Sequence, residues 1–231
     1  MLPSPESKSC RDVSRILSIY SYDDSHRSSF NAFDEYVIRQ LRSLLFFRNY
    51  KSSLREWPGK ILCLKKFKLL RVLMLTDFDF RNSKCSPLRT VGKLVYFKYL
   101  SFLNSSLEEL PSSVGDLKNL QTLDIRVRGD INIPNVLWKL TQLRHLYFPL
   151  HKIRKQDAVK KLRLHGLNEL ELMRYFDTTF CETNDLMTLR KLRVFHGRVI
   201  VKDLEELMTT VISRGSSLEL FWLNVSSRKI L

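Results

Sequence analysis

Glycine is scarce in this chain, with 7 residues among 231, and no two glycines lie closer than 14 residues apart. The glycine-rich loops GxGxxG and GxxxxGK[ST], which cradle nucleotide phosphates, are therefore absent. The four cysteines, Cys10, Cys63, Cys85 and Cys181, form no CxxC pair, so neither a zinc knuckle nor a dithiol redox motif is indicated. No apolar run reaches the roughly 18 residues that a membrane-spanning helix needs.

Acidic residues are also few, since 24 Asp and Glu stand against 39 Lys and Arg and give a formal net charge of +15. Apolar residues make up 44% of the chain, which is typical of a globular fold. The first residues, MLPSPESKSCR, lack the apolar core of a signal peptide, and the dispersed cysteines suit a reducing compartment. We therefore expect a cytoplasmic protein.

Catalytic and metal-binding patterns are missing as well. The five histidines show no HExxH or other ligand spacing, and Glu169 and Glu171 have no general-acid partner near them in the sequence. Neither a nucleophile elbow nor a kinase signature occurs. The sequence therefore predicts a protein that is not an enzyme and that uses no cofactor and no metal.

What the chain does contain is a repeat of the form Leu-x-x-Leu-x-Leu, in which Phe, Ile or Val replaces some leucines. Eight copies occur, and their first positions are 41, 70, 97, 120, 143, 167, 189 and 218. The intervals lie between 22 and 29 residues, which is the period of leucine-rich repeats. The pattern predicts an α/β leucine-rich-repeat solenoid of about eight repeats.

In each copy the last two apolar positions are two residues apart, so they share one face of a short strand. Stacked copies would bury this face and form a curved parallel sheet with short helices and turns on its convex side. We expect a lead-in or capping segment over residues 1–40 and the repeat domain over 41–231. Five apolar residues at helical spacing predict a convex amphipathic helix: Leu204, Leu207, Met208, Val211 and Ile212.

Four stretches carry a resemblance to a known family: RSLLFF at 42–47, LRVL at 70–73, LPSSVGDLKNLQTL at 110–123 and LWKLTQLRHL at 137–146. They resemble the leucine-rich-repeat region of plant intracellular nucleotide-binding disease resistance proteins of the coiled-coil, late-blight-resistance type. The resemblance runs from about Arg15 to the end. It implies a part in plant innate immunity and the hypersensitive response. The motifs of that family's nucleotide-binding module are absent, so we expect a truncated receptor and carry over no nucleotide binding.

The residues between the inward-facing strand positions are expected to point to the concave surface. Exposed aromatic and arginine side chains are typical anchors of protein interfaces. The same residues also fit a plain strand surface that binds nothing. The candidate partner-binding residues are Thr122, Asp124, Arg126, His145, Tyr147, Glu169, Glu171, Met173, Lys191, Arg193, Phe195, Trp222 and Asn224.

Two lysine- and arginine-rich runs lie mostly between the expected strands, on the convex side or its flank. They are interpreted either as solvated surface or as a docking surface for an acidic partner, such as the nucleotide-binding switch domain of a related receptor. Nucleic acid is the less favoured partner, because no binding motif accompanies the charge. The candidate residues are Lys60, Lys65, Lys66, Lys68, Arg71, Lys152, Arg154, Lys155, Lys160, Lys161 and Arg163.

Together these features favour a non-catalytic module that recognises a pathogen effector or a guarded host protein. It would regulate a nucleotide-binding switch in cis or in trans. Two alternatives remain at the level of sequence: a basic nucleic-acid-binding protein, and a receptor remnant without function.

Overall fold

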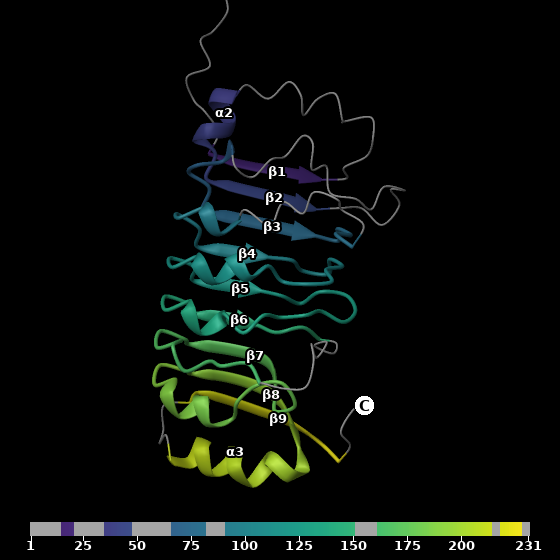
Figure 1. Cartoon of the computed structure of the whole chain (residues 1–231), viewed down its shortest axis with the longest axis vertical. Coiled ribbons are helices and arrows are strands. Elements are labelled where there is room, and N and C mark those ends of the chain that lie inside the picture. Colours follow the sequence, from purple (N-terminus) through teal and green to yellow (C-terminus); the bar gives the residue numbers. More distant parts are fainter. Residues whose placement is uncertain are drawn as a thin grey trace, which may run out of the picture.

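A computed structural model describes residues 15–20, 35–47, 66–81, 91–150, 161–213 and 218–227 of the chain. In these segments a single sheet of nine parallel strands follows the order of the sequence (Figure 1). The strands are β1 (Ile16–Tyr20), β2 (Ser43–Phe47), β3 (Val72–Thr76), β4 (Tyr99–Ser101), β5 (Thr122–Asp124), β6 (His145–Tyr147), β7 (Leu172–Asp177), β8 (Val194–Ile200) and β9 (Leu220–Ser226). The predicted leucine-rich-repeat solenoid is confirmed.

The strand centres form one continuous line of buried side chains. Leu44, Leu73, Leu100, Leu123 and Leu146 are register partners from β2 to β6, and each of them is fully buried. Because alternate residues of a strand point to opposite faces, their neighbours in the strands lie on the concave surface. Burial of the leucine line in a column is what holds successive repeats together.

In the described residues the convex side carries short 3₁₀ helices and a longer α-helix. The short helices include η4 (Ser112–Asp116), η5 (Leu137–Lys139) and η6 (Asn184–Thr188), and each of these three ends at a buried leucine that turns the chain back toward the sheet. Repeats pack very closely here. A Cβ added to Gly166 would stand 2.1 Å from the carbonyl oxygen of Trp138 in the preceding repeat, so only glycine fits.

The predicted amphipathic helix is present as α3 (Val201–Ser213), which packs against η6 and β8. Its buried stripe is rotated from the expected one. Leu207 is fully buried together with Asp203 and Thr210, whereas Met208 and Ile212 face outward. Among the described elements the helix contacts η6, β8 and β9, and the residues on that side are the buried ones.

The segment 1–40, expected to be a lead-in, contributes more than a cap. Strand β1 pairs with β2 in parallel, with Leu17 opposite Leu44, and so extends the same sheet by one strand. The helix α2 (Glu35–Gln40) follows, and its Ile38 packs against the core. The repeat pattern therefore begins before position 41, although Ser14 stands where the other repeats place an apolar residue.

Candidate partner-binding surface

The concave surface changes character along the solenoid. From β2 to β4 its outward positions are mostly aliphatic or aromatic and half-buried: Leu45, Phe47, Val72, Met74 and Tyr99. From β5 onward, polar, charged and ring-bearing side chains take over. The functional interest therefore centres on β5 to β9, where most predicted concave residues also lie.

Polar side chains of β5 and its neighbours form a connected cluster. The guanidinium of Arg126 donates hydrogen bonds to both carboxylate oxygens of Asp124, at 2.9 and 2.7 Å, and Ser101 donates a third at 3.3 Å. The carboxylate raises the pKa of Arg126. Asp124 is only 1% exposed, so it positions Arg126 and is not itself open to a partner.

Two further contacts join this cluster to β6. The guanidinium carbon of Arg126 lies 4.8 Å from the ring centre of Tyr147, a cation–π distance. Thr122 Oγ1 and His145 Nδ1 share a hydrogen bond of 3.0 Å. Thr122, Arg126, His145 and Tyr147 are thus placed on the concave surface as predicted, each half-buried and held by a neighbouring repeat.

Three rings form a row across the last three strands. Tyr175 of β7 lies 5.1 Å from His196 of β8, and His196 lies 5.8 Å from Trp222 of β9, measured between ring centres. Tyr175 sits at an irregularity in the pairing of β7 with β8 and has φ +62°. This left-handed conformation is costly for a tyrosine, and here the bulge places an extra ring beside His196.

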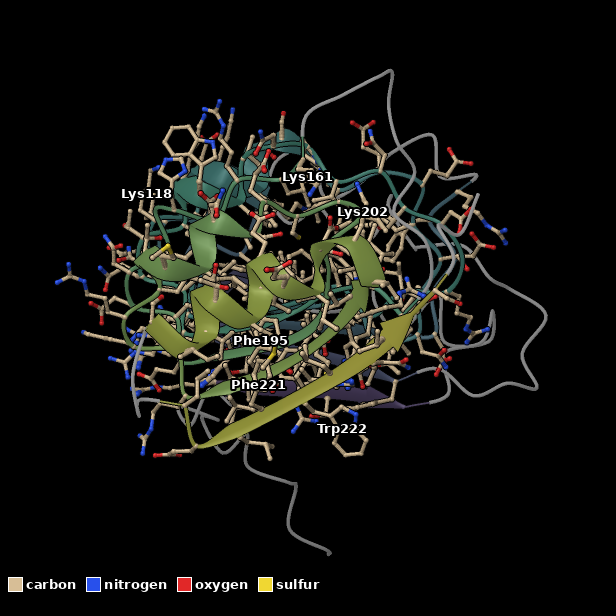
Figure 2. The ribbon with its side chains drawn as sticks, turned by 90° about the horizontal axis from the view of Figure 1, so that it is seen from below. Lys118, Lys161, Phe195, Lys202, Phe221 and Trp222 are labelled. Carbon is tan, nitrogen blue, oxygen red and sulfur yellow. The ribbon has the colours of Figure 1, made fainter. Side chains whose placement is uncertain are left out.

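Trp222 is the most exposed member of this row, with 64% of its surface open to solvent. Figure 2 shows it on the side of β9 that faces away from α3, while Phe195 and Phe221 lie between β9 and the helix. Burial together with the positive charge of Arg174 lowers the pKa of His196.

Two residues that were predicted to lie on the concave surface are buried instead. Met173 and Phe195 are 0% and 1% exposed, because they occupy the buried line as register partners of Leu146 and Phe221. Leucines recur every three residues in these units, at 164, 167 and 170 and again at 186, 189 and 192. The repeats predicted to begin at Leu167 and Leu189 in fact begin three residues later, at Leu170 and Leu192. With this alignment both leucines correspond to Leu143 of the preceding repeat, and Met173 and Phe195 fall on the buried line.

The same shift moves four charged residues off the strands. Lys191 binds Glu169 through hydrogen bonds of 2.7 and 2.6 Å, and both lie in the turns that precede the strands. Glu171 and Arg193 stand immediately before β7 and β8, at the edge of the sheet. The residues that sequence analysis missed on the concave surface are Leu172, Arg174, Tyr175 and His196. Asn224 is exposed on the same face as Trp222.

A column of mostly charged residues runs along this edge. Each backbone N–H of the residue before a strand donates to the carbonyl of its counterpart one repeat earlier, from Arg42 on Arg15 through to Glu219 on Arg193. We call Arg15, Arg42, Arg71 and Lys98 the basic edge. Toward the C-terminal end of the solenoid, residues of the same column form ion pairs with one another: Arg144 pairs with Glu171, and Arg193 pairs with Glu219.

Only part of the predicted basic docking surface can be located. Lys60, Lys65, Lys152, Arg154, Lys155 and Lys160 lie outside the described residues. Arg71 belongs to the basic edge, and Lys66 and Lys68 are exposed in the turn before it. Lys161 and Arg163 lie a long way along the solenoid, in the turn that leads to β7. The described members of the two runs therefore lie in different repeats.

The described segments contain no cluster of three or more His, Cys, Asp or Glu side chains suited to a metal ion. Within the same segments no helix is both long and apolar enough to cross a bilayer. Cys181 is fully buried, and this burial raises the pKa of its thiol well above the usual value. A buried, protonated thiol is a poor nucleophile.

A stacked parallel sheet with 22- to 29-residue repeats and short convex helices defines a leucine-rich-repeat protein. The family model described as "Leucine-rich repeat region" matches residues 40–225, and the chain belongs to this family.

Two solved structures share the fold at 15% sequence identity. Internalin C2 of Listeria monocytogenes has a TM-score of 0.56, with 87% of this chain and 90% of that one covered. A leucine-rich-repeat protein of Leptospira interrogans has a TM-score of 0.60, with 93% and 62% covered.

Among curated proteins, the chain is similar to plant disease resistance proteins. It is 33% identical over 189 residues to a putative disease resistance protein of Arabidopsis thaliana, which covers 81% of this chain. It is 39% identical over 129 residues to the disease resistance protein RPP8 of the same plant, which covers 54%. The matched segments span only 19% and 13% of those two relatives.

Proposed function

We propose that this chain is a non-catalytic recognition module of plant innate immunity that binds a pathogen effector or a guarded host protein on its concave face. The observation that carries the proposal is the run of rings and arginines from β6 to β9, which are half-buried except for the exposed Trp222. Tyr, Trp and Arg are the residue types that most often dominate binding energy at protein interfaces. The similarity to disease resistance proteins of Arabidopsis supports the biological setting, and the cytoplasm is the proposed place of action.

The basic edge suits a second, regulatory contact. Arg42, Arg71 and Lys98 lie within ion-pair distance of no acidic side chain among the described residues. Adjacent strands are about 4.8 Å apart, so these cations form a dense positive line. We propose that this line docks on an acidic surface of a nucleotide-binding switch, in cis or in trans. Ligand binding on the concave face would then bias the switch through differential affinity for its two states.

Site-specific photocrosslinking tests the concave site. We would introduce benzoylphenylalanine at Trp222 or Tyr147 of the concave face, and at Met187 of the convex side as the matched control. In infected plant tissue we expect one defined protein to crosslink at both concave positions and not at position 187. Purified, that protein should lose about tenfold or more in affinity on Trp222→Ala, as expected for a hot-spot residue. Equal crosslinking at all three positions would contradict the proposal.

Charge reversal tests the switch contact. The triple variant Arg42→Glu, Arg71→Glu and Lys98→Glu should lose co-purification with the nucleotide-binding module of a related receptor. The control is Arg193→Glu combined with Glu219→Arg, which inverts a pair that is already neutralised. If wild-type protein binds RNA or DNA with an affinity that falls steeply with added salt, and the triple variant loses this binding, the nucleic-acid alternative is supported instead.

A further inference from the structure

One arginine on the concave face, Arg174, has no acidic partner among the described residues. Arg174 lies on the outward row of β7, because its neighbour Met173 is fully buried and successive strand residues alternate between faces. Its register partners are Tyr147 on β6 and His196 on β8. No acidic side chain of the described segments lies within ion-pair distance of Arg174, which is half-buried.

The arginines around it are used differently. Arg126 is paired with Asp124 at 2.7 Å, and Arg198 is paired with Asp177 at 2.5 Å. Both carboxylates are almost completely buried, so the charges of these two arginines are already neutralised within the chain. Within the part of the chain that the structure describes, Arg174 is therefore an unpaired cation between two neutralised pairs.

Its immediate surroundings are rings. Tyr147 and His196 flank Arg174 within the row, and Tyr175 lies in contact with His196. Leu172 adds an aliphatic surface two residues away on the same strand. A guanidinium that is partly shielded from water gains more from a charged partner than a fully hydrated one does, because local dielectric screening is weaker. Burial, and second the positive charge of Arg174, lower the pKa of His196.

We propose that Arg174 is a carboxylate-binding subsite that selects a protein segment with an Asp or Glu side chain next to an aromatic or aliphatic one. The carboxylate would accept two parallel hydrogen bonds from the guanidinium fork. The adjacent apolar side chain would pack on Tyr147, Tyr175 or Trp222. This subsite rests on the proposed function and names the chemistry that the concave face recognises.

A peptide suits the site better than a nucleic acid does. Nucleic-acid affinity depends on several phosphate contacts made by unpaired cations. On this part of the concave face the neighbouring guanidinium groups of Arg126 and Arg198 are already bound to buried carboxylates. The unpaired guanidinium of Arg174, which lies beside the rings of Tyr147 and His196, therefore suits a peptide that carries one carboxylate next to an apolar side chain.

A selection with a random peptide library displayed on phage tests the proposal on the full chain. Wild-type protein should enrich peptides in which Asp or Glu neighbours an aromatic or aliphatic residue. The best peptide is then synthesised, together with its amide counterpart, in which Gln or Asn replaces the acid. Both are titrated against wild type, Arg174→Gln and Arg174→Lys. We expect Arg174→Gln to weaken the acidic peptide by roughly 10- to 100-fold, the range for a charge-assisted hydrogen bond, and to leave the amide peptide unchanged.

Arg174→Lys should retain part of the affinity, because the charge stays but the planar fork is lost. The matched control is Arg190→Gln, an exposed arginine in the turn after η6, which should bind like wild type. Urea unfolding of each variant verifies that it is folded. Equal affinity of the acidic and amide peptides for wild type would overturn the carboxylate subsite.

Trp222→Ala separates this inference from the proposed function. Loss of binding on Trp222→Ala but not on Arg174→Gln would leave concave recognition standing and refute the role of Arg174. Selected peptides that are indifferent to both substitutions would refute concave recognition itself. Selected peptides without acidic residues would refute the carboxylate preference alone.

Discussion

The register of β7 makes a sharp prediction about Met173. The residue is fully buried between Leu146 and Phe195, its partners on the two neighbouring strands. Met173→Ala removes three heavy atoms, at about 0.8 kcal/mol for each methylene-sized group, which gives about 2.4 kcal/mol. Because strands on both sides keep the space from collapsing, a cavity term adds to this, and we expect a loss of about 3 kcal/mol. Leu172→Ala, on the concave surface, should cost less than about 1 kcal/mol.

Urea unfolding monitored by circular dichroism measures both variants. The midpoint of Met173→Ala should fall well below that of wild type, while Leu172→Ala stays close to it. In a thermal scan, a loss of 3 kcal/mol corresponds to about 6–12 °C for a chain of this size. The alignment predicted from the sequence alone places Leu172 in the core and Met173 on the concave surface, and so requires the larger loss of stability for Leu172→Ala. A larger loss for Leu172→Ala would therefore refute the register and the placement of Arg174 with it.

Three further outcomes are expected. Gly166→Ala should destabilise the chain by about 1–3 kcal/mol in urea unfolding, because its Cβ would collide with the backbone of Trp138. In NMR titrations His196 should show a pKa below 6.5, and Arg174→Gln should raise it. Since the folded state disfavours the protonated ring, His196 should lower stability as pH falls through about 6.5, and His196→Gln should flatten this slope. Cys181 should react with thiol reagents only on unfolding, as peptide-level mass spectrometry would detect.

The sequence predicted the architecture well because the repeat is a packing requirement. A leucine at the strand centre and two residues later is needed in every repeat to fill the space behind the sheet, so the pattern recurs along the chain. The concave positions of β5 and β6 followed directly from it, including Thr122, Arg126, His145 and Tyr147. The helix α3 was also found from its periodicity, although its buried face was not.

The sequence could not decide the register of β7 and β8. Leucines three residues apart serve both the convex turn and the strand, so two alignments satisfy the same apolar pattern. Only contact with the neighbouring strands distinguishes them, because register is set by which residues are buried against β6 and β9. The bulge at Tyr175 is equally invisible, since it arises from the mismatch between β7 and β8.

Sequence alone therefore determined the class of fold and the range of repeat lengths, 22 to 29 residues. These properties depend on residue types at short, regular spacing, which is local information. Tertiary structure decided that Arg174 lies between Tyr147 and His196 on the neighbouring strands, and that the buried carboxylate of Asp124 forms an ion pair with Arg126. It also decided that Arg15, Arg42, Arg71 and Lys98 form one line. Except for Asp124 and Arg126, which are two residues apart, those groups are more than 20 residues apart in the chain, and only the stacking of repeats brings them within reach of one another.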